Sequence, residues 1–397
     1  MLKHSQRLSA AFAVLLFAGA VLSGCGTSPE QENTGEYREG AVTRSLVSTG
    51  NTARLNRVFE KAAAGEDLTF AYVGGSITEG YATGARTPEC YASLTAAEFE
   101  TAYCKGGTVT CQNNGLSGTP SVLGFLRADT EVLQEQPDVI FIEFAVNDGS
   151  DQVYQTSYES LVRNCLEQPN EPAVILLFTY MQNGHTCQDQ QQAIGEYYDL
   201  GMISVRDAVA PLLESGEMLW GEYGADDVHP SAEGHRLIAD MVANYFAAAK
   251  KKKPDKDYAV PADSLHPGLY RNGRFCDASN TLYHDGSWEP GSHNNYFRAG
   301  FVFQKETANE PLSMNVTGRV LFVVYKQYSD PEWGLAGVYV NDELVGILNA
   351  NKPGGWGGPQ VDVVETYDSV QDLHVEIRML DDQTDKSFEV LALGVCE

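Results

Sequence analysis

Basic residues are scarce in this chain. Its 397 residues include 27 lysines and arginines against 54 aspartates and glutamates, so its formal net charge at pH 7 is -27. A field of this sign repels phosphate backbones and anionic lipid head groups. The composition therefore predicts that nucleic acid is not a partner.

A hydrophobic run of bilayer length is missing from the N-terminus. The apolar stretch at residues 10–22 follows Lys3 and Arg7, and it is too short for a membrane span but typical of an export signal. The sequence LSGCG around Cys25 resembles the lipobox at which bacterial lipoproteins are cleaved and lipidated. We therefore expect a signal peptide at 1–24 and a protein anchored through the Cys25 lipid to the extracellular face of a bacterial membrane. An ordinary signal peptide or a short anchor helix is the alternative.

Metal-binding spacings are also missing. Seven cysteines follow Cys25, and none forms a CxxC or Cys/His pattern typical of zinc. We therefore expect no metal site. An odd number leaves at least one free thiol if the others pair. Cys276 and Cys396 could close the C-terminal part of the chain, although sequence alone leaves the pairing open.

Residues 25–49 are rich in small and polar side chains, which predicts a flexible tether. Beyond the tether, apolar runs alternate with segments of helical periodicity up to about residue 250. The predicted strands lie at 68–73, 108–113, 139–144, 173–180 and 202–205, and the predicted helices near 90–103, 120–134, 157–167, 188–199 and 232–249. Continuous apolar runs suit strands that are covered on both faces, and this alternation predicts an α/β domain with a parallel sheet at residues 50–250.

The pattern changes after four consecutive lysines that end at Lys253. Prolines and polar residues predict a linker at 251–262. Residues 263–397 contain short alternating runs separated by Gly, Asn and Pro, which predict a β-sandwich of jelly-roll type. Two domains also agree with the length, because a single core rarely grows to this size.

Ser76 is the first residue with a candidate chemical role. It lies just past a predicted strand, after Gly74 and Gly75 and shortly before Gly80. A strand, a glycine turn, a serine and then a helix is the plan of a nucleophile elbow, which exposes Oγ at the carboxyl end of a sheet. On its own, Gly-Gly-Ser is more often an ordinary turn, so the hypothesis needs partner residues.

The partners are found near the end of the same domain. His229 follows Asp226 by three residues and precedes a proline, so one loop can hold the imidazole beside the carboxylate. The alternative is a surface turn. Gly118 follows the second predicted strand and Asn147 the third, and their N–H groups could stabilise a developing negative charge.

Together these four blocks resemble the SGNH hydrolases, also called the GDSL esterase/lipase superfamily. The resemblance covers about 66–248 and implies a three-layer flavodoxin-like fold that needs no cofactor. It implies Ser76 as nucleophile, Asp226 and His229 as the rest of a triad, and an oxyanion hole formed by the N–H groups of Ser76 and Gly118 with the side chain of Asn147.

Two positions depart from the family pattern. Gly75 stands where the family name implies aspartate, and Ala145 stands where glycine is usual. Neither change removes a catalytic group. We expect the methyl group of Ala145 to narrow the pocket near the oxyanion.

An esterase followed by a β-sandwich is similar to bacterial carbohydrate O-acetyl esterases, including mannan acetyl esterases. This resemblance implies deacetylation of a carbohydrate through an acetyl-serine. The candidate sugar-contacting residues, each with a packed core as the alternative role, are Trp220, Trp288, Trp333 and Trp356. A lysophospholipase or thioesterase would instead need a long apolar acyl groove, and a third class is a non-catalytic glycan-binding lipoprotein. The polysaccharide, the hydroxyl position and the oligomeric state stay open.

Overall fold

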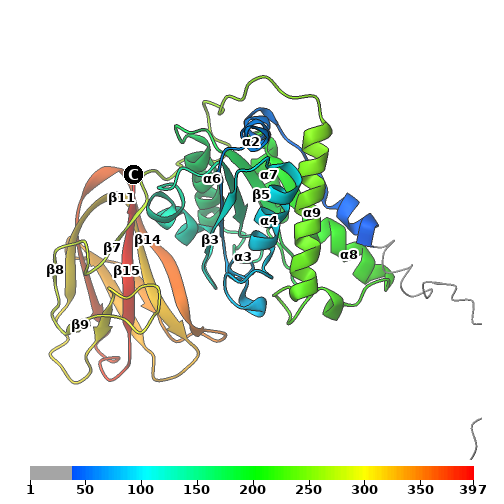
Figure 1. The fold of residues 1–397 in the computed structure, drawn as a ribbon. Helices are drawn as coiled ribbons and strands as arrows, with labels where there is room; N and C mark the ends of the chain where they lie inside the picture. Colours follow the sequence, from blue (N-terminus) through cyan, green and yellow to red (C-terminus); the bar gives the residue numbers. More distant parts are fainter. Residues whose placement is uncertain (1–37) are drawn as a thin grey trace, which may run out of the picture.

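The structure is a computed structural model that describes residues 38–397 (Figure 1). The predicted signal peptide, Cys25 and the first part of the predicted tether lie outside the described residues. In the part of the chain that is described, no helix has both the length and the apolar character needed to cross a bilayer.

A six-stranded sheet forms the centre of the N-terminal domain, with the order β1-β6-β5-β4-β2-β3. Its strands are β1 (Leu46–Ser48), β2 (Leu68–Gly74), β3 (Val109–Gly115), β4 (Val139–Glu143), β5 (Ala173–Phe178) and β6 (Gly201–Ser204). All pair in parallel except the edge strand β1. In chain order the five parallel strands are arranged 2-1-3-4-5, which is the flavodoxin-like order, and it creates a ligand crevice at the carboxyl ends of β2 and β4.

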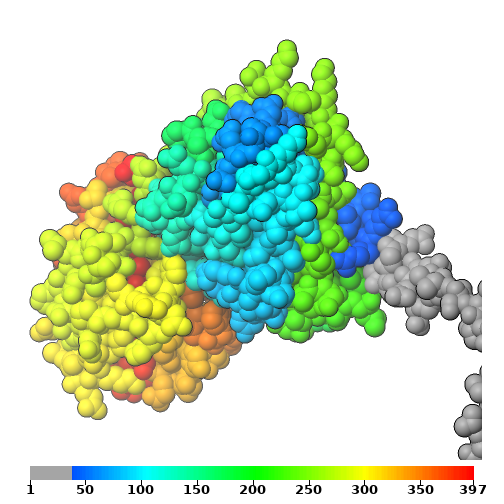
Figure 2. Space-filling model, viewed as in Figure 1, coloured from blue at the N-terminus to red at the C-terminus, as the bar shows by residue number. Residues whose placement is uncertain are grey.

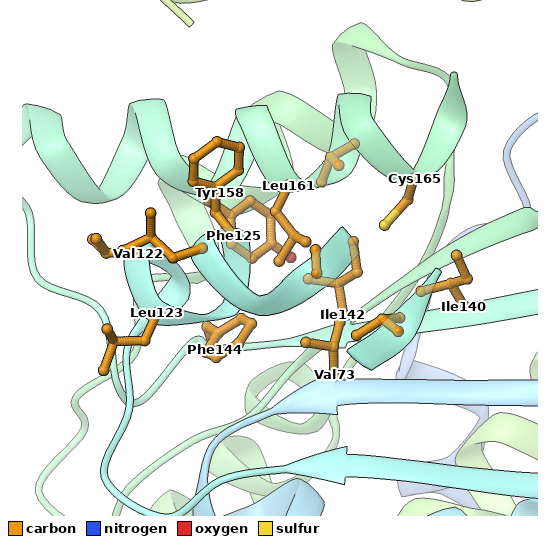
Figure 3. Close-up of a cluster of buried hydrophobic side chains, with 14 of the residues drawn as sticks. Val73, Val122, Leu123, Phe125, Ile140, Ile142, Phe144, Tyr158, Leu161 and Cys165 are labelled. Atoms are coloured by element: carbon orange, nitrogen blue, oxygen red, sulfur yellow. The ribbon is translucent and has the colours of Figure 1, made fainter. Parts of the chain in front are cut away.

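Helices cover both faces of this sheet. One face is covered by α5 (Ser121–Arg127), α6 (Gln152–Leu166) and α7 (Gln188–Tyr197), and the other by α2 (Ala53–Ala64), α4 (Tyr91–Tyr103), α8 (Val205–Ser215) and α9 (Ala232–Lys251). Figure 3 shows Phe125 of α5 and Leu161 of α6 gathered with Ile142 of the sheet in one of the two buried clusters. The predicted three-layer α/β fold is confirmed, with each predicted strand within two residues of its position.

The first described residues belong to the folded domain. Residues 38–48 begin with a helix and end in β1, which pairs antiparallel with β6. Ala41 is fully buried, and Arg38 forms an ion pair of 2.7 Å with Asp240 of α9. The prediction of a flexible tether over 25–49 is therefore wrong for residues 38–48. Its polar composition concealed the contacts that anchor it to the sheet edge and to α9.

The C-terminal domain consists of antiparallel strands. These are β7 (Arg274–Cys276), β8 (Tyr283–His284), β9 (Trp288–Pro290), β10 (Phe301–Phe303), β11 (Leu312–Tyr328), β12 (Leu335–Val340), β13 (Glu343–Asn349), β14 (Trp356–Met379) and β15 (Glu389–Cys396). The two longest, β11 and β14, pair along their length with several register shifts, which allow them to bend around one interior cluster. The predicted β-sandwich is confirmed (Figure 1).

The suggested bridge between Cys276 and Cys396 does not form. Cys276 is paired with Leu393 in the β7–β15 register, and Cys396 lies three residues further along β15. The two thiols face different buried clusters, because odd spacings along a strand point to opposite faces. All seven cysteines of the described part are unpaired.

The two domains lie in contact with each other (Figure 2). Buried residues of both domains belong to one hydrophobic cluster. The ring centroid of Tyr270 lies 5.9 Å from that of Phe125 on α5 and 5.5 Å from that of Phe322 on β11. The linker joins this packing, since the Tyr258 hydroxyl donates a hydrogen bond of 2.8 Å to the carbonyl of Tyr198. The second domain is therefore held in a defined position beside the sheet.

Candidate active site

Ser76 begins a four-residue helix, α3 (Ser76–Glu79), directly after β2. Gly74 must be a glycine here, because an added Cβ would lie 2.2 Å from Thr78 Oγ1. Gly80 ends the helix with φ of 87°, a left-handed conformation that suits glycine. The turn holds Ser76 at the carboxyl end of the sheet, where only 5% of its surface is exposed.

Three of the predicted residues meet in one hydrogen-bonded chain. His229 Nε2 lies 2.9 Å from Ser76 Oγ, and His229 Nδ1 lies 2.8 Å from Asp226 Oδ2. The residues come from opposite ends of the domain, 153 positions apart. This is the geometry in which an imidazole can take the proton of a serine hydroxyl while a carboxylate orients the ring.

The loop that carries Asp226 is rigidly held. Asp226 Oδ1 accepts hydrogen bonds from the N–H groups of Val228 at 2.8 Å and His229 at 2.7 Å. Burial raises the pKa of Asp226, but the hydrogen bonds from the His229 N–H, the His229 ring and the Val228 N–H lower it more, so the net pKa is below its ordinary value. Trp220 Nε1 donates to the Asp226 carbonyl oxygen at 2.7 Å. This hydrogen bond from Trp220 helps to hold the loop that carries Asp226 in place.

Gly118 and Asn147 lie on the loops that follow β3 and β4. Gly118 has φ of 70°, and Asn147 closes a turn through its N–H to the Phe144 carbonyl. The Asn147 amide packs directly on Gly75, where an added Cβ would lie 2.2 Å from its Oδ1. Among residues 38–397 the buried Oδ1 of Asn147 has no hydrogen-bond partner, and the Nδ2 of the same amide is the group that can donate to a ligand.

Two buried acids support these loops, and the sequence analysis missed them. Asp148 Oδ1 accepts the Ser121 N–H at 2.8 Å, and burial raises the pKa of Asp148 to about 7. Glu143 accepts the Thr78 hydroxyl at 2.8 Å, and burial raises its pKa as well. Glu143 lies at the end of the predicted strand 139–144, and Asp148 follows four residues after it. Their positions at the carboxyl end of a strand are the feature of the sequence that could have indicated a role in the site.

A third acid ties the Gly118 loop to the nucleophile helix. Glu79 of α3 accepts the Ser117 N–H at 3.0 Å and the Ser117 hydroxyl as well. Arg86 Nη1 lies 3.3 Å from Glu79 Oε1 in an ion pair, and Arg86 Nη2 donates a hydrogen bond of 2.8 Å to the Gly115 carbonyl oxygen. The segments that carry Ser76 and Gly118 therefore form one connected unit.

The four candidate tryptophans separate into different environments. Trp356 is 62% exposed and lies over Gly118, where an added Cβ would be 2.2 Å from its ring. Trp288 is only 3% exposed and packs on Phe303 inside the β-sandwich, so its candidacy as a substrate-binding residue is wrong. Trp333 is half-buried beneath Lys326, and Trp220 braces the triad loop.

One aromatic residue of the site was not predicted. Tyr81 opens the 3-10 helix η1 (Tyr81–Thr83), and its ring centroid lies 4.5 Å from that of His229. The ring is 60% exposed. Its position five residues after the nucleophile was the signal available in the sequence.

Ala145 does not narrow the pocket as expected. Its side chain is fully buried in the cluster beneath α5 and α6. The methyl group packs into the core although Ala145 already lies in the turn that follows the end of β4 at Glu143.

Among the described residues, no group of three or more His, Cys, Asp or Glu side chains could hold a metal ion.

Comparison with known families agrees with this arrangement. Residues 72–237 match the GDSL-like lipase/acylhydrolase family. The matched segment lies within the N-terminal domain, which is similar to this family from β2 to the first half of α9. The segment matched by the GDSL-like family contains Ser76, Gly118, Asn147, Asp226 and His229. The match and the geometry of these residues support a carboxylic ester hydrolase.

Solved structures share the two-domain fold. The structure of a two-domain esterase active on acetylated mannans matches with a TM-score of 0.82 at 24% identity, covering 90% of this chain and 98% of that one. The same esterase co-crystallised with mannopentaose matches with a TM-score of 0.81, with the same identity and coverage. No curated protein sequence matches the chain.

Proposed function

We propose that this protein is a serine esterase that removes O-acetyl groups from carbohydrate. The observation that carries the reaction is the hydrogen-bonded chain of Ser76, His229 and Asp226 at the carboxyl end of the sheet. Support for a carbohydrate substrate comes from Trp356, which brings an exposed aromatic ring of the second domain to the Gly118 loop. It also comes from the shared fold with an esterase active on acetylated mannans.

The proposed reaction has two acyl-transfer steps. His229 Nε2 accepts the proton of Ser76 Oγ as that oxygen attacks the ester carbonyl, while Asp226 stabilises the imidazolium. The N–H groups of Ser76 and Gly118 and the Asn147 amide donate to the tetrahedral oxyanion. His229 then protonates the departing sugar oxygen. Water then attacks the acetyl-serine and loses its proton to His229. The bond between the acyl carbon and Ser76 Oγ breaks, His229 returns the proton to Oγ, and acetate leaves.

Trp356 has a proposed role in binding the polymer. Its ring lies beside the oxyanion loop and comes from the other domain, so a sugar can lie between the two domains against an aromatic face. Tryptophan supplies a large apolar surface together with an N–H donor, which suits the mixed surface of a pyranose. We keep Trp333 as a comparison residue because it is half-buried under Lys326.

The test is acetate release from acetylated mannans, xylans and pectins by wild type and Ser76→Ala. We expect release by wild type and a loss of about 10⁴-fold or more in the variant, as for removal of a serine nucleophile elsewhere. Trp356→Ala should weaken activity on polymer more than on p-nitrophenyl acetate, whereas Trp333→Ala should change both little. Absence of acetate release from every polymer would refute the carbohydrate assignment, and a preference for p-nitrophenyl palmitate would favour a lipid acyl hydrolase. If wild type and Ser76→Ala bound glycan but were equally inert on short esters, the protein would be a binding module.

The proposal also includes export and lipid attachment at Cys25. The motif LSGCG and the preceding apolar run support it. In bacterial cells, Cys25→Ala should move the esterase from the membrane fraction to the soluble fraction. Retention of the variant on the membrane would contradict attachment through this thiol.

A further inference from the structure

We infer that Tyr81 forms the subsite for the sugar that loses its acetyl group. This inference rests on the proposed function and deepens it, because it assigns the alcohol side of the ester to a particular residue. The ring of Tyr81 is exposed and belongs to none of the buried hydrophobic clusters of the described residues.

Tyr81 is placed by the same short segment that places the nucleophile. Gly80, with φ of 87°, turns the chain out of α3, and its N–H donates to the Ser76 carbonyl at 3.0 Å. The Arg86 N–H donates to the Glu79 carbonyl at 2.7 Å, which closes the loop after Tyr81. The ring therefore keeps a defined position relative to Ser76.

Tyr81 contacts the imidazole that handles the proton. The ring centroids of Tyr81 and His229 are 4.5 Å apart with 37° between their planes. His229 Nε2 is 2.9 Å from Ser76 Oγ, so it is the atom that must protonate the leaving oxygen. The atoms bonded to that oxygen must lie next to His229, and they therefore meet the exposed ring of Tyr81.

The opposite side of the site is assigned to the carbonyl oxygen. The oxyanion donors are on the Gly118 and Asn147 loops, and Trp356 covers Gly118. Tyr81 and Trp356 are 60% and 62% exposed, far above the large aromatic side chains of the core. One aromatic ring thus stands at the leaving-group side and one at the oxyanion side. A sugar ester can contact both while its carbonyl carbon faces Ser76.

The chemistry of Tyr81 suits a sugar ring. The face of a tyrosine offers an apolar surface to the C–H side of a pyranose, and its hydroxyl can bond to a neighbouring sugar hydroxyl. An ester with a very small alcohol has no such surface. Tyr81 should consequently discriminate between leaving groups without changing the attack on the acetyl group.

The test compares two acetyl esters that differ in their alcohol. For Tyr81→Ala we expect kcat/KM on an acetylated manno-oligosaccharide to fall about tenfold or more, as expected when an aromatic contact is lost. On ethyl acetate it should stay within about twofold, because the acetyl side and the triad are unchanged. Tyr81→Phe should keep most of the activity on the sugar ester. The control Tyr283→Ala removes a partly exposed aromatic residue of the C-terminal domain and should change neither substrate.

The activities of Tyr81→Ala on the two esters separate the possible roles of Tyr81. Equal losses on both esters would show that Tyr81 only supports His229, and unchanged activity on both would show that it does not contact the sugar. Either result overturns the inference while the proposed function stands. If wild type hydrolyses ethyl acetate but no acetylated sugar, the proposed function fails and the sugar subsite fails with it.

Discussion

Gly75 and Asn147 illustrate how single residues shape this site. The Asn147 amide occupies the space that a side chain at position 75 would need, since an added Cβ would come within 2.2 Å of its Oδ1. The aspartate that the family name implies at this position cannot be accommodated without moving Asn147. Gly-Gly-Ser in place of Gly-Asp-Ser thus follows from the position of the oxyanion donor.

Asp148 gives a prediction about pH at the residue scale. Burial raises its pKa to about 7 in the folded protein, whereas an unfolded aspartate ionises near a pKa of about 3.9. Between these values the folded state binds more protons than the unfolded state, so the free energy of unfolding should fall as pH rises from about 4 to 7, by up to about 1.4 kcal/mol per pH unit.

The Asp148→Asn variant should lack this contribution. Asparagine keeps an oxygen that can accept the Ser121 N–H and carries no titratable proton. Urea unfolding measured at several pH values should therefore show the variant losing less stability than wild type between pH 4 and 7. Asp372→Asn, at an exposed position on β14, is the control and should follow wild type. Parallel stability curves for wild type and Asp148→Asn would contradict the prediction.

At the scale of elements, the nucleophile helix and the oxyanion loop act as one unit. Glu79 joins them by accepting the N–H and the hydroxyl of Ser117, the residue before Gly118. Arg86 reinforces the contact from the loop that follows Tyr81. An oxyanion donor contributes fully only if it is already in position when charge develops, so this contact should matter most in the transition state.

Glu79→Ala should therefore reduce kcat about ten- to hundredfold, with KM on p-nitrophenyl acetate changed by less than about threefold. Glu79→Gln retains an acceptor for the Ser117 N–H and should recover much of the loss. Glu60→Ala, on the exposed side of α2, is the matched control. A rise in KM at constant kcat, or equal losses in the Ala and Gln variants, would show that the contact does not position the oxyanion loop.

At the scale of the whole molecule, the two domains share a hydrophobic cluster. Phe322 of β11 is fully buried and its ring contacts that of Tyr270, which in turn contacts Phe125 of α5. The adjacent residues Leu321 and Val323 point instead into the core of the β-sandwich. The middle of β11, residues 320–325, is thus buried on both faces. The two domains should unfold together, because neither can expose its share of the cluster without losing the burial that stabilises the other.

Calorimetry of the full chain should accordingly show a single thermal transition. Phe322→Ala should destabilise this whole transition by about 3 kcal/mol or more, as large-to-small changes in a packed core do. Leu282→Ala, which removes a side chain that is 92% exposed, should change stability by less than about 0.5 kcal/mol. Two wild-type transitions, of which Phe322→Ala shifts only one, would show that the domains are energetically separate.

The sequence by itself determined the α/β domain, its strands, and the placing of Ser76, Gly118 and Asn147 at strand ends. Strands covered on both faces appear as continuous apolar runs, and glycine and asparagine mark the turns that follow them. The three-residue spacing of Asp226 and His229 is short enough for one loop to bring them together, and the structure shows that contact.

Only the tertiary structure decided which aromatic residues reach the site and how its loops are held. Trp288 and Trp356 have similar surroundings in the sequence, yet one is buried in the β-sandwich and the other lies over Gly118. Which face a strand residue occupies depends on register and on the packing of a second domain, and neither is a local property of the chain. For the same reason the contact between the rings of Tyr81 and His229, whose positions are 148 residues apart in the sequence, emerged only from the fold.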